Sequence, residues 1–295
     1  MIDSVGRPVF SILMPSLNQA SFVEDAIRSV HAQAGDVDIE HIVIDGGSTD
    51  GTVEILERHR DHLAQLIVEP DSGQADALNR GLALATGAFV AFLNTDDLYL
   101  PGALSAAMTG FAESGADWLC GDTIRFGAGH PTKLVSADVP RSVRDALTWS
   151  YDAPQPGMFW RRDVVDHFDT RFQYVFDHEL YVRLLRAGVR CHHLPIPVAA
   201  YRLHPASKTV AEAAAMDAEF DAVSRLHQPD LPPALARRVA ALRSIRDVVH
   251  RGADRNGDGG ALVRVAARDP LIVRHRAYWG AVKAVVRQRA RESRR

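Results

Sequence analysis

Short apolar runs recur along the first hundred residues, separated by stretches of helical periodicity. Each run is rich in branched or aromatic residues and is bounded by turn-forming residues, as buried strands are. Runs of this kind occupy residues 9–14, 42–44, 66–68 and 89–93. The intervening stretches 21–34, 52–63 and 76–85 repeat apolar residues at helical intervals, which predicts amphipathic helices. This alternation predicts right-handed crossovers and a mainly parallel central sheet flanked by helices, an α/β fold.

The rest of the chain follows a different pattern. Short strands at 118–120, 157–160 and 198–201, with a helix at 176–187, predict a mixed α+β segment. An alanine-rich helical region follows, interrupted by a proline-rich loop at 228–233, and residues 251–260 have the composition of a flexible linker. We therefore expect an α/β domain over residues 1–208 and a helical C-terminal extension over residues 209–295.

Composition excludes several classes of protein. The 295 residues are 46% hydrophobic and 24% charged, with a net charge of −3, which argues against a nucleic-acid-binding protein as a whole. Two cysteines, Cys120 and Cys191, cannot form a disulfide framework, so a reducing compartment is expected. No apolar run reaches the ~18 residues of a membrane span, and the N-terminus lacks a basic segment followed by an apolar one. We expect a cytoplasmic protein.

Polar clusters follow each of the four strand-like runs, at residues 15–18, 45–52, 69–73 and 94–97. In an open parallel sheet the carboxyl ends of the strands meet at one edge, where ligands bind. Carboxylates gathered there repel one another and raise one another's pKa unless they share a cation. Mg²⁺ and Mn²⁺ suit such a site, using one or two carboxylates and ligand phosphate oxygens. A nucleoside diphosphate held through a divalent metal is the expected ligand.

Each cluster alone has a simpler interpretation. Residues 45–48 are equally consistent with a turn whose polar residues cap the next helix. The loop is neither a Walker loop nor a G-x-G-x-x-G motif. The pair Asp96–Asp97 is also common at loop starts. Their positions at successive strand ends of one sheet favour a binding site.

A series of motifs, in order along the chain, resembles the family 2 glycosyltransferases with the GT-A fold. The motifs are Asn18 after the first strand, DGGSTDGT at 45–52, DSGQADALNRG at 71–81, ATG at 85–87, LNTDD at 93–97, QPGMFWR at 155–161, FDHELYVR at 176–183 and YRLH at 201–204. The resemblance covers residues 7–208, whereas the C-terminal third carries none of it. It implies a Rossmann-like GT-A domain with a donor half over 1–100 and an acceptor half over 101–208.

The resemblance implies a metal-dependent, inverting transfer of a sugar from a nucleoside diphosphate to a hydroxyl of a saccharide or glycoconjugate. Binding of the nucleotide sugar is implied for Pro15, Ser16, Asn18, Asp45, Gly47, Ser48, Asp76, Asn79, Asn94, Thr95 and Asp96. Asp97 and His204 are the implied ligands of Mn²⁺ or Mg²⁺, and the reverse assignment of Asp96 and Asp97 stays open. Asn94 stands where many members have an aspartate.

Asp177 is the candidate general base. An acceptor hydroxyl that attacks the anomeric carbon needs a base on one side of the sugar, and the departing diphosphate needs a cation on the other. Asp177 lies far along the chain from the metal carboxylates, as this geometry requires. The family commonly has Glu-Asp here, and this chain has Phe176–Asp177. The alternative is that Asp177 only caps its helix, which contributes ~1 kcal/mol.

Acceptor contacts are implied for Asp122, Trp160, Glu179 and Arg183. The alternatives are a turn at Asp122, core packing of Trp160 and a surface ion pair between Glu179 and Arg183.

The tail after Ala261 combines an apolar stripe with many basic residues. A helix on the inner face of the cell membrane, near a lipid-linked acceptor, and a terminal helix packed on the catalytic domain are equally consistent with it. Two rival functions are a nucleotidyltransferase acting on sugar phosphates and a non-catalytic GT-A-like binding protein.

Overall fold

The computed structural model describes residues 10–35, 37–148, 153–208, 212–229 and 231–252, and a few positions between 262 and 282. The chain divides into two compact units. One comprises Met1–Ala146 and Ser150–Ala222, and the other comprises Leu147–Trp149 and Val223–Arg295. The named strands all belong to the first unit, which also contains the residues discussed below as a site.

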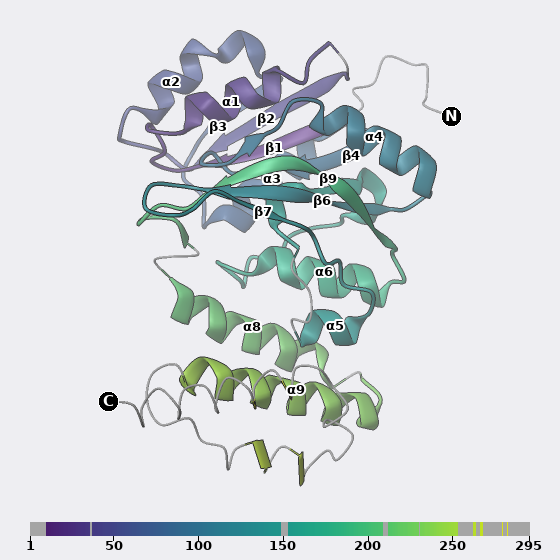
Figure 1. Cartoon of the computed structure of the whole chain (residues 1–295). Coiled ribbons are helices and arrows are strands. Elements are labelled where there is room, and N and C mark those ends of the chain that lie inside the picture. Colours follow the sequence, from purple (N-terminus) through teal and green to yellow (C-terminus); the bar gives the residue numbers. More distant parts are fainter. Residues whose placement is uncertain are drawn as a thin grey trace. The chain divides into compact units, whose positions relative to one another are not determined.

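The N-terminal half of the first unit has the predicted alternation of strands and helices. Its elements are β1 (Phe10–Ser16), α1 (Val23–His31), β2 (Ile39–Asp45), α2 (Thr52–Arg58), the 3₁₀ turn η1 (Arg60–His62), β3 (Gln65–Val68), α3 (Gln74–Leu84) and β4 (Phe89–Phe92). The strands lie in the order β3-β2-β1-β4 and are all parallel, as predicted. Helices α1 and α2 cover one face of this sheet and α3 the other (Figure 1).

The following segment adds antiparallel strands to the same sheet. Its elements are β5 (Leu98–Tyr99), α4 (Ala103–Ser114), β6 (Trp118–Phe126), β7 (Lys133–Val135), α5 (Val143–Leu147), η2 (Gln155–Gly157), β8 (Met158–Arg161), η3 (Arg162–Val164), α6 (Phe176–Arg186) and β9 (Cys191–Arg202). Strand β8 runs antiparallel between β4 and β6, whereas β6 and β9 are parallel. The sheet as a whole is therefore mixed, with the parallel strands β3-β2-β1-β4 from the first half and one further parallel pair, β6 and β9, from the second.

Two helices follow, α8 (Ala213–His227) and α9 (Pro233–Gly252), on either side of the predicted proline-rich loop. Most of the predicted linker and almost all of the basic tail lie outside the described residues. In the part of the chain that the structure describes, no helix has the length and apolarity to cross a membrane.

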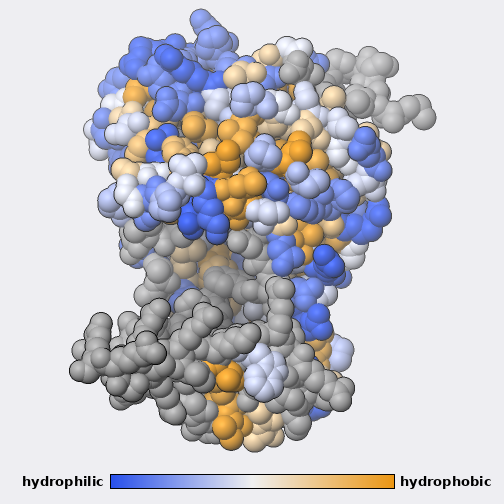
Figure 2. Space-filling model, in the orientation of Figure 1, coloured by the Kyte–Doolittle hydropathy of each residue, from blue (hydrophilic) through white to orange (hydrophobic). Residues whose placement is uncertain are grey.

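The core lies on both faces of the sheet because strand side chains alternate between them. On the face covered by α1 and α4, Phe89 stacks on Phe111 with ring centroids 4.2 Å apart. On the other face, Trp118 and Trp160 pack against Tyr181 of α6, at 4.9 and 6.4 Å. This packing presses α6 against the sheet. Where α1 and α2 meet solvent, Figure 2 shows mainly hydrophilic side chains.

His41 on β2 is a buried polar side chain, only 2% exposed. Among the described residues, neither of its ring nitrogens has a hydrogen-bond partner, and the ring of His31 lies 5.9 Å away. Burial, with a smaller contribution from the charge of His31, lowers the pKa of His41 to about 3. His41 is therefore neutral in the folded chain, but it binds a proton in the unfolded chain below about pH 6.5.

The free energy of unfolding should consequently fall as pH drops below about 6.5, and continue to fall down to about pH 3. Replacing His41 by Leu should remove about 2 kcal/mol of the loss seen between pH 7.5 and pH 5. Urea unfolding at the two pH values measures this difference. The matched control, His192→Leu at an exposed position, should leave the difference unchanged. If His41→Leu and the unsubstituted chain lost the same free energy of unfolding between pH 7.5 and pH 5, the result would contradict this explanation.

Candidate active site

The loop after β2 is shaped by Asp45. This residue is completely buried and pairs in register with Ser16 at the end of β1. Its Oδ1 accepts hydrogen bonds from the backbone N–H groups of Gly47 (3.0 Å) and Ser48 (2.7 Å), and its Oδ2 accepts the Ser48 hydroxyl (2.7 Å). The Asp45 carboxylate therefore holds the glycine loop in place from beneath.

Asn18 joins the loops after β1 and β2. Its backbone N–H donates to Ser48 Oγ at 2.7 Å, and its Oδ1 accepts the Thr49 N–H at 2.9 Å. Its φ of 54° lies in the left-handed region, which asparagine tolerates better than most residues. Pro15 and Ser16, just before it, are buried. The two loops thus form one continuous wall.

The third strand end lies against this wall. A Cβ on Gly46 would lie only 2.8 Å from Asp71 Oδ2, so the absence of a side chain lets the two loops meet. Asp71 Oδ1 in turn accepts the Gly73 N–H at 2.9 Å. The polar ends of β1, β2 and β3 therefore do gather at one edge of the sheet.

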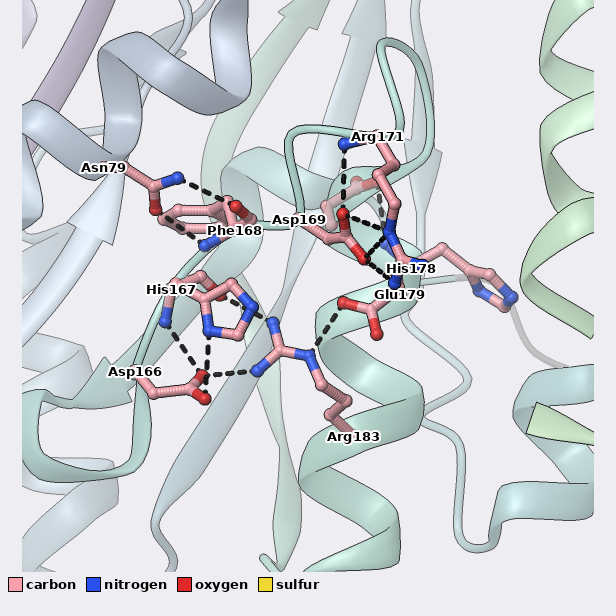
Figure 3. Close-up of polar contacts among 10 residues, drawn as sticks. Asn79, Asp166, His167, Phe168, Asp169, Arg171, His178, Glu179 and Arg183 are labelled. Carbon is pink, nitrogen blue, oxygen red and sulfur yellow. Dashed lines mark hydrogen bonds and ion pairs between the residues drawn. The ribbon is translucent and has the colours of Figure 1, made fainter. Parts of the chain in front are cut away.

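Asp76 and Asn79 on α3 are engaged in contacts within the protein. Asp76 accepts hydrogen bonds from the Ser72 N–H (3.0 Å) and from Arg80 (3.1 Å). The amide of Asn79 donates to the Phe168 carbonyl (2.8 Å) and accepts the Phe168 N–H (2.7 Å), as Figure 3 shows. Both side chains thus orient α3 and its neighbouring loops.

An acidic cluster follows β4. Asp97 is 5% exposed, and its oxygens accept the Arg202 N–H (3.0 Å) and the Asn94 Nδ2–H (3.3 Å). Asp96 Oδ2 lies 3.0 Å from His204 Nε2, and the neighbouring Thr95 is buried. Burial and the charge of Asp96 raise the pKa of the Asp97 carboxyl well above its usual range. His204 therefore contacts Asp96, the aspartate for which the resemblance implied binding of the nucleotide sugar.

A chain of amides leads from this cluster to a lysine. Asn94 Nδ2 donates also to Gln155 Oε1 (3.3 Å), and Asn94 Oδ1 accepts from Gln74 Nε2 (2.6 Å). Lys208 Nζ donates to Gln74 Oε1 (2.7 Å) and to the Gln173 carbonyl (3.1 Å). Gln74 and Gln155 lie inside the quoted motifs, but as uncharged side chains they attracted no functional interpretation.

Asp177 lies in the first turn of α6 and is half-buried. Burial raises the pKa of Asp177 to about 6, although the hydrogen bond from the His178 N–H and the positive charge of Lys208 both lower it. Removal from water lowers the pKa of Lys208, while Asp177 and Asp96 are among the carboxylates that favour its charge. Lys208 therefore lies near both Asp177 and the acidic cluster.

The pair Glu179–Arg183 is present, but it is not a surface pair. The Glu179 side chain is 2% exposed, and Arg183 Nε donates to its Oε2 at 2.8 Å. Arg183 also pairs with Asp166 and donates to the His167 carbonyl at 2.6 Å (Figure 3). These contacts tie the loop before α6 to the helix that carries Asp177.

The two other implied acceptor residues are also internal. Trp160 is 1% exposed and packs in the core, as its alternative interpretation had it, so its ring has no face open to a sugar. Asp122 is 7% exposed, lies 2.7 Å from His193 Nε2 and accepts the Ala137 N–H at 2.8 Å. The Trp160 ring packs against Phe92 of β4 and Tyr181 of α6, whereas Asp122 ties β6 to Ala137 and to His193 of β9.

Comparison with known proteins identifies the class. Residues 11–168 match the sequence pattern of Glycosyl transferase family 2. The chain is a glycosyltransferase, and it belongs to that family, as the motifs indicated. Membership of this family argues against the two rival functions, a nucleotidyltransferase and a non-catalytic GT-A-like binding protein.

A curated relative and two solved structures illustrate the similarity. A PGL/p-HBAD biosynthesis glycosyltransferase of Mycobacterium tuberculosis is 27% identical over 213 residues, covering 67% of this chain and 75% of the relative. Staphylococcus aureus TarS 1–349 in complex with UDP-GlcNAc superimposes with a TM-score of 0.64 at 18% identity, over 95% of this chain and 88% of TarS.

The mannosyltransferase PcManGT of Pyrobaculum calidifontis, in complex with GDP-Man and Mn²⁺, gives a TM-score of 0.55 at 18% identity, over 99% of this chain and 76% of that protein. At these identities the two structures establish the fold, which is of the GT-A type expected from the sequence.

Proposed function

We propose that this glycosyltransferase is metal-dependent and inverting, with a nucleoside-diphosphate sugar as donor, a hydroxyl of a saccharide or glycoconjugate as acceptor, and Asp177 as general base. The observation that carries the proposal is the contrast between two groups of carboxylates. Asp96 and Asp97 are adjacent after β4, and the charge of Asp96 helps to raise the pKa of Asp97. Asp177, in contrast, lies on α6, where burial raises its pKa to about 6 and the nearby Lys208 partly opposes that rise. A single displacement needs a base on one side of the sugar and charge compensation for the leaving diphosphate on the other.

The nucleotide is proposed to lie against the joined loops after β1 and β2. Pro15, Ser16, Asn18, Gly47 and Ser48 form the wall of that pocket, which Asp45 supports from beneath. Asp76, Asn79, Asn94 and Thr95 act by fixing α3 and the acidic loop. The complexes of TarS with UDP-GlcNAc and of PcManGT with GDP-Man support a nucleotide sugar as the class of donor.

In the part of the chain that the structure describes, no group of three or more acidic, histidine or cysteine side chains could hold a metal ion, so a divalent metal here would need further oxygens from the ligand. Asp97 is buried beside a second carboxylate, and the resulting rise in its pKa is the electrostatic cost that a bound cation removes. Mg²⁺ and Mn²⁺ use one or two carboxylates and take further oxygens from ligand phosphates. Asp96 or Asp97, with His204, would hold the ion, and it would stabilise the negative charge of the departing diphosphate. The Mn²⁺ in the PcManGT complex supports this class of cofactor.

Asp177 is proposed to take the proton of the acceptor hydroxyl. A general base works best when its pKa lies near the working pH, and a value of about 6 meets this condition better than that of an ordinary aspartate. The carboxylate predominates above pH 6 and the inactive acid below it. Lys208, near Asp177 and Asp96, offers a positive charge to the leaving group.

The setting of the reaction is proposed from the relatives and the sequence. The mycobacterial relative is named for PGL/p-HBAD biosynthesis, which supports a biosynthetic role in building a glycoconjugate. Cytoplasmic location, a catalytic domain over residues 1–208 and peripheral membrane contact by the basic tail stay predictions.

UDP or GDP together with Mn²⁺ should raise the melting temperature by about 5 °C at a hundredfold excess over Kd, whereas AMP with Mn²⁺ should not. Asp97→Ala should lose the Mn²⁺-dependent part of this rise, because it removes a carboxylate that is proposed to bind the metal. Thermal melting with and without EDTA measures both effects. Asp163→Ala, at an exposed aspartate, is the matched control and should behave like the unsubstituted chain. A flat response to every nucleoside diphosphate would remove the donor assignment.

Asp177→Asn should abolish sugar transfer and donor hydrolysis while keeping the nucleotide-induced rise in melting temperature. For the unsubstituted enzyme, kcat should fall about tenfold per pH unit as pH is lowered below about 6, because Asp177 becomes protonated. A screen of nucleotide sugars for metal-dependent hydrolysis supplies the assay without an acceptor. Asp163→Asn should retain full activity. Transfer that survives in Asp177→Asn would mean that the base lies elsewhere.

A further inference from the structure

Helix α6, which carries Asp177, has no polar residue of its own at the N-cap position. The residue there is Val175, whose side chain cannot accept a hydrogen bond. The first N–H groups of a helix have no acceptor inside the helix and need one from outside. Within the first turn, Asp177 supplies an acceptor to the His178 N–H at 2.8 Å. Val175 and Phe176, in contrast, have no polar side chain to offer to the residues that lead into the helix.

A distant carboxylate supplies acceptors for the N-cap residue and the two residues before it. Glu219 of α8 accepts the Gln173 N–H on Oε1 at 2.8 Å, and it accepts the Tyr174 and Val175 N–H groups on Oε2 at 2.8 and 3.1 Å. Three consecutive backbone donors immediately before α6 therefore converge on one side chain. Hydrogen bonds to an ionised carboxylate are stronger than neutral ones, and a negative charge is favourable at a helix N-terminus.

The same segment touches two other parts of the candidate active site. The Gln173 carbonyl accepts from Lys208 Nζ, and the Lys208 ammonium lies 5.7 Å from the centre of the Tyr174 ring. The Gln173 side chain donates to the Ser72 carbonyl at 3.4 Å, in the loop after β3. Residues 173–175 thus connect the base helix, the lysine and the loop beside the glycine wall.

A second contact holds α8 to α6 independently of Glu219. The ring of Phe220 meets the ring of His178 edge to face, with centroids 5.0 Å apart. Loss of the Glu219 carboxylate would therefore release residues 173–175 while this ring contact remains. The effect of a substitution at Glu219 should fall on the start of α6, two residues from Asp177.

We propose that Glu219 is a positioning residue for sugar transfer, a cap supplied by α8 that holds residues 173–175 and thereby aims Asp177 and Lys208. The inference rests on the role proposed for Asp177. It gives the first helix beyond the family-like region a part in the reaction, although Glu219 touches neither Asp177 nor the acidic cluster in any contact described above. Small displacements of a reacting group by a remote change can cost about a hundredfold in rate.

The test compares Glu219→Ala, Glu219→Gln and the matched control Glu212→Ala in the full-length enzyme. Glu212 is an exposed glutamate just before the same helix. The assay is release of nucleoside diphosphate from the nucleotide sugar that the unsubstituted enzyme hydrolyses in the donor screen, at a temperature where all variants are folded. Amide hydrogen exchange over residues 172–178 is followed in parallel.

We expect Glu219→Ala to lower kcat by about 10- to 100-fold with a donor KM within about threefold of the original, because the nucleotide wall is untouched. Glu219→Gln keeps one acceptor oxygen and loses the charge, so its kcat should lie between that of Glu219→Ala and that of the unsubstituted enzyme. Exchange over residues 172–178 should rise in both variants and stay unchanged in Glu212→Ala. If Glu219→Ala does not fold, Glu219→Gln decides the question.

Unchanged kcat in a folded Glu219 variant, or a loss shared equally by Glu212→Ala, overturns the inference. A rise in donor KM without a change in kcat does so as well, since it would assign Glu219 to donor binding. Asp177→Asn separates this failure from that of the proposed function. An inactive Asp177→Asn beside a fully active Glu219→Ala removes the inference alone, whereas an active Asp177→Asn removes the base assignment and the inference together.

Discussion

The burial of Asp97 beside Asp96 is the constraint on which the arrangement of the site depends. Removing a carboxylate from water costs several kcal/mol unless hydrogen bonds and opposite charge compensate it, and a second carboxylate adds repulsion. The chain compensates in part by aiming the Arg202 N–H at one oxygen of Asp97 and the Asn94 amide at the other. The Arg202 N–H has its position because β9 pairs with β5, directly after the aspartates, so the antiparallel extension of the sheet also builds the acidic cluster.

Helix α6, which carries the proposed base, meets a different requirement. In that role Asp177 would need to be partly withdrawn from water so that its pKa rises, and also to remain reachable by an acceptor. The packing of Tyr181 against Trp118 and Trp160 holds the helix on the sheet, and the Glu179–Arg183 pair ties it to the preceding loop. Three of the side chains implied as acceptor contacts, Trp160, Glu179 and Arg183, thus help to hold α6 in place.

The sequence was sufficient for the elements that depend on local periodicity. The strands β1 to β4 and the helices between them follow from their own apolar patterns, and their polar ends follow from the rule for parallel sheets. Helix α4 was not predicted because Pro101–Gly102 and a run of small residues resemble a loop. Strand β9 was recognised only at its end. Its prolines, Pro195 and Pro197, argue against a strand, but Pro197 falls at the irregularity where the register with β6 shifts.

Long-range partners account for what the sequence could not reveal about the site. Nothing near Gln74 or Gln155 indicates that their amides meet at Asn94, because each contact joins segments separated by at least twenty residues. The same holds for Lys208 and Glu219, whose partners lie on other elements. The spacing of Glu179 and Arg183 was also misleading about exposure, since it is typical of a surface ion pair but Glu179 is buried.

Asn94, where the chain departs from the common family pattern, illustrates how the local charge is balanced. Its amide donates toward Asp97 Oδ2 at 3.3 Å and accepts from Gln74 on its other side. An aspartate at this position would place a third carboxylate against two that already repel each other, and it could not donate to either neighbour. The Asn94 amide instead donates a hydrogen bond to the buried carboxylate. Because Lys208 donates to Gln74 and Gln74 donates to Asn94, this hydrogen bond is the last of a chain that begins at a positive charge. With two carboxylates rather than three in the loop after β4, the amide chain from Lys208 supplies part of the charge compensation that the buried Asp97 needs.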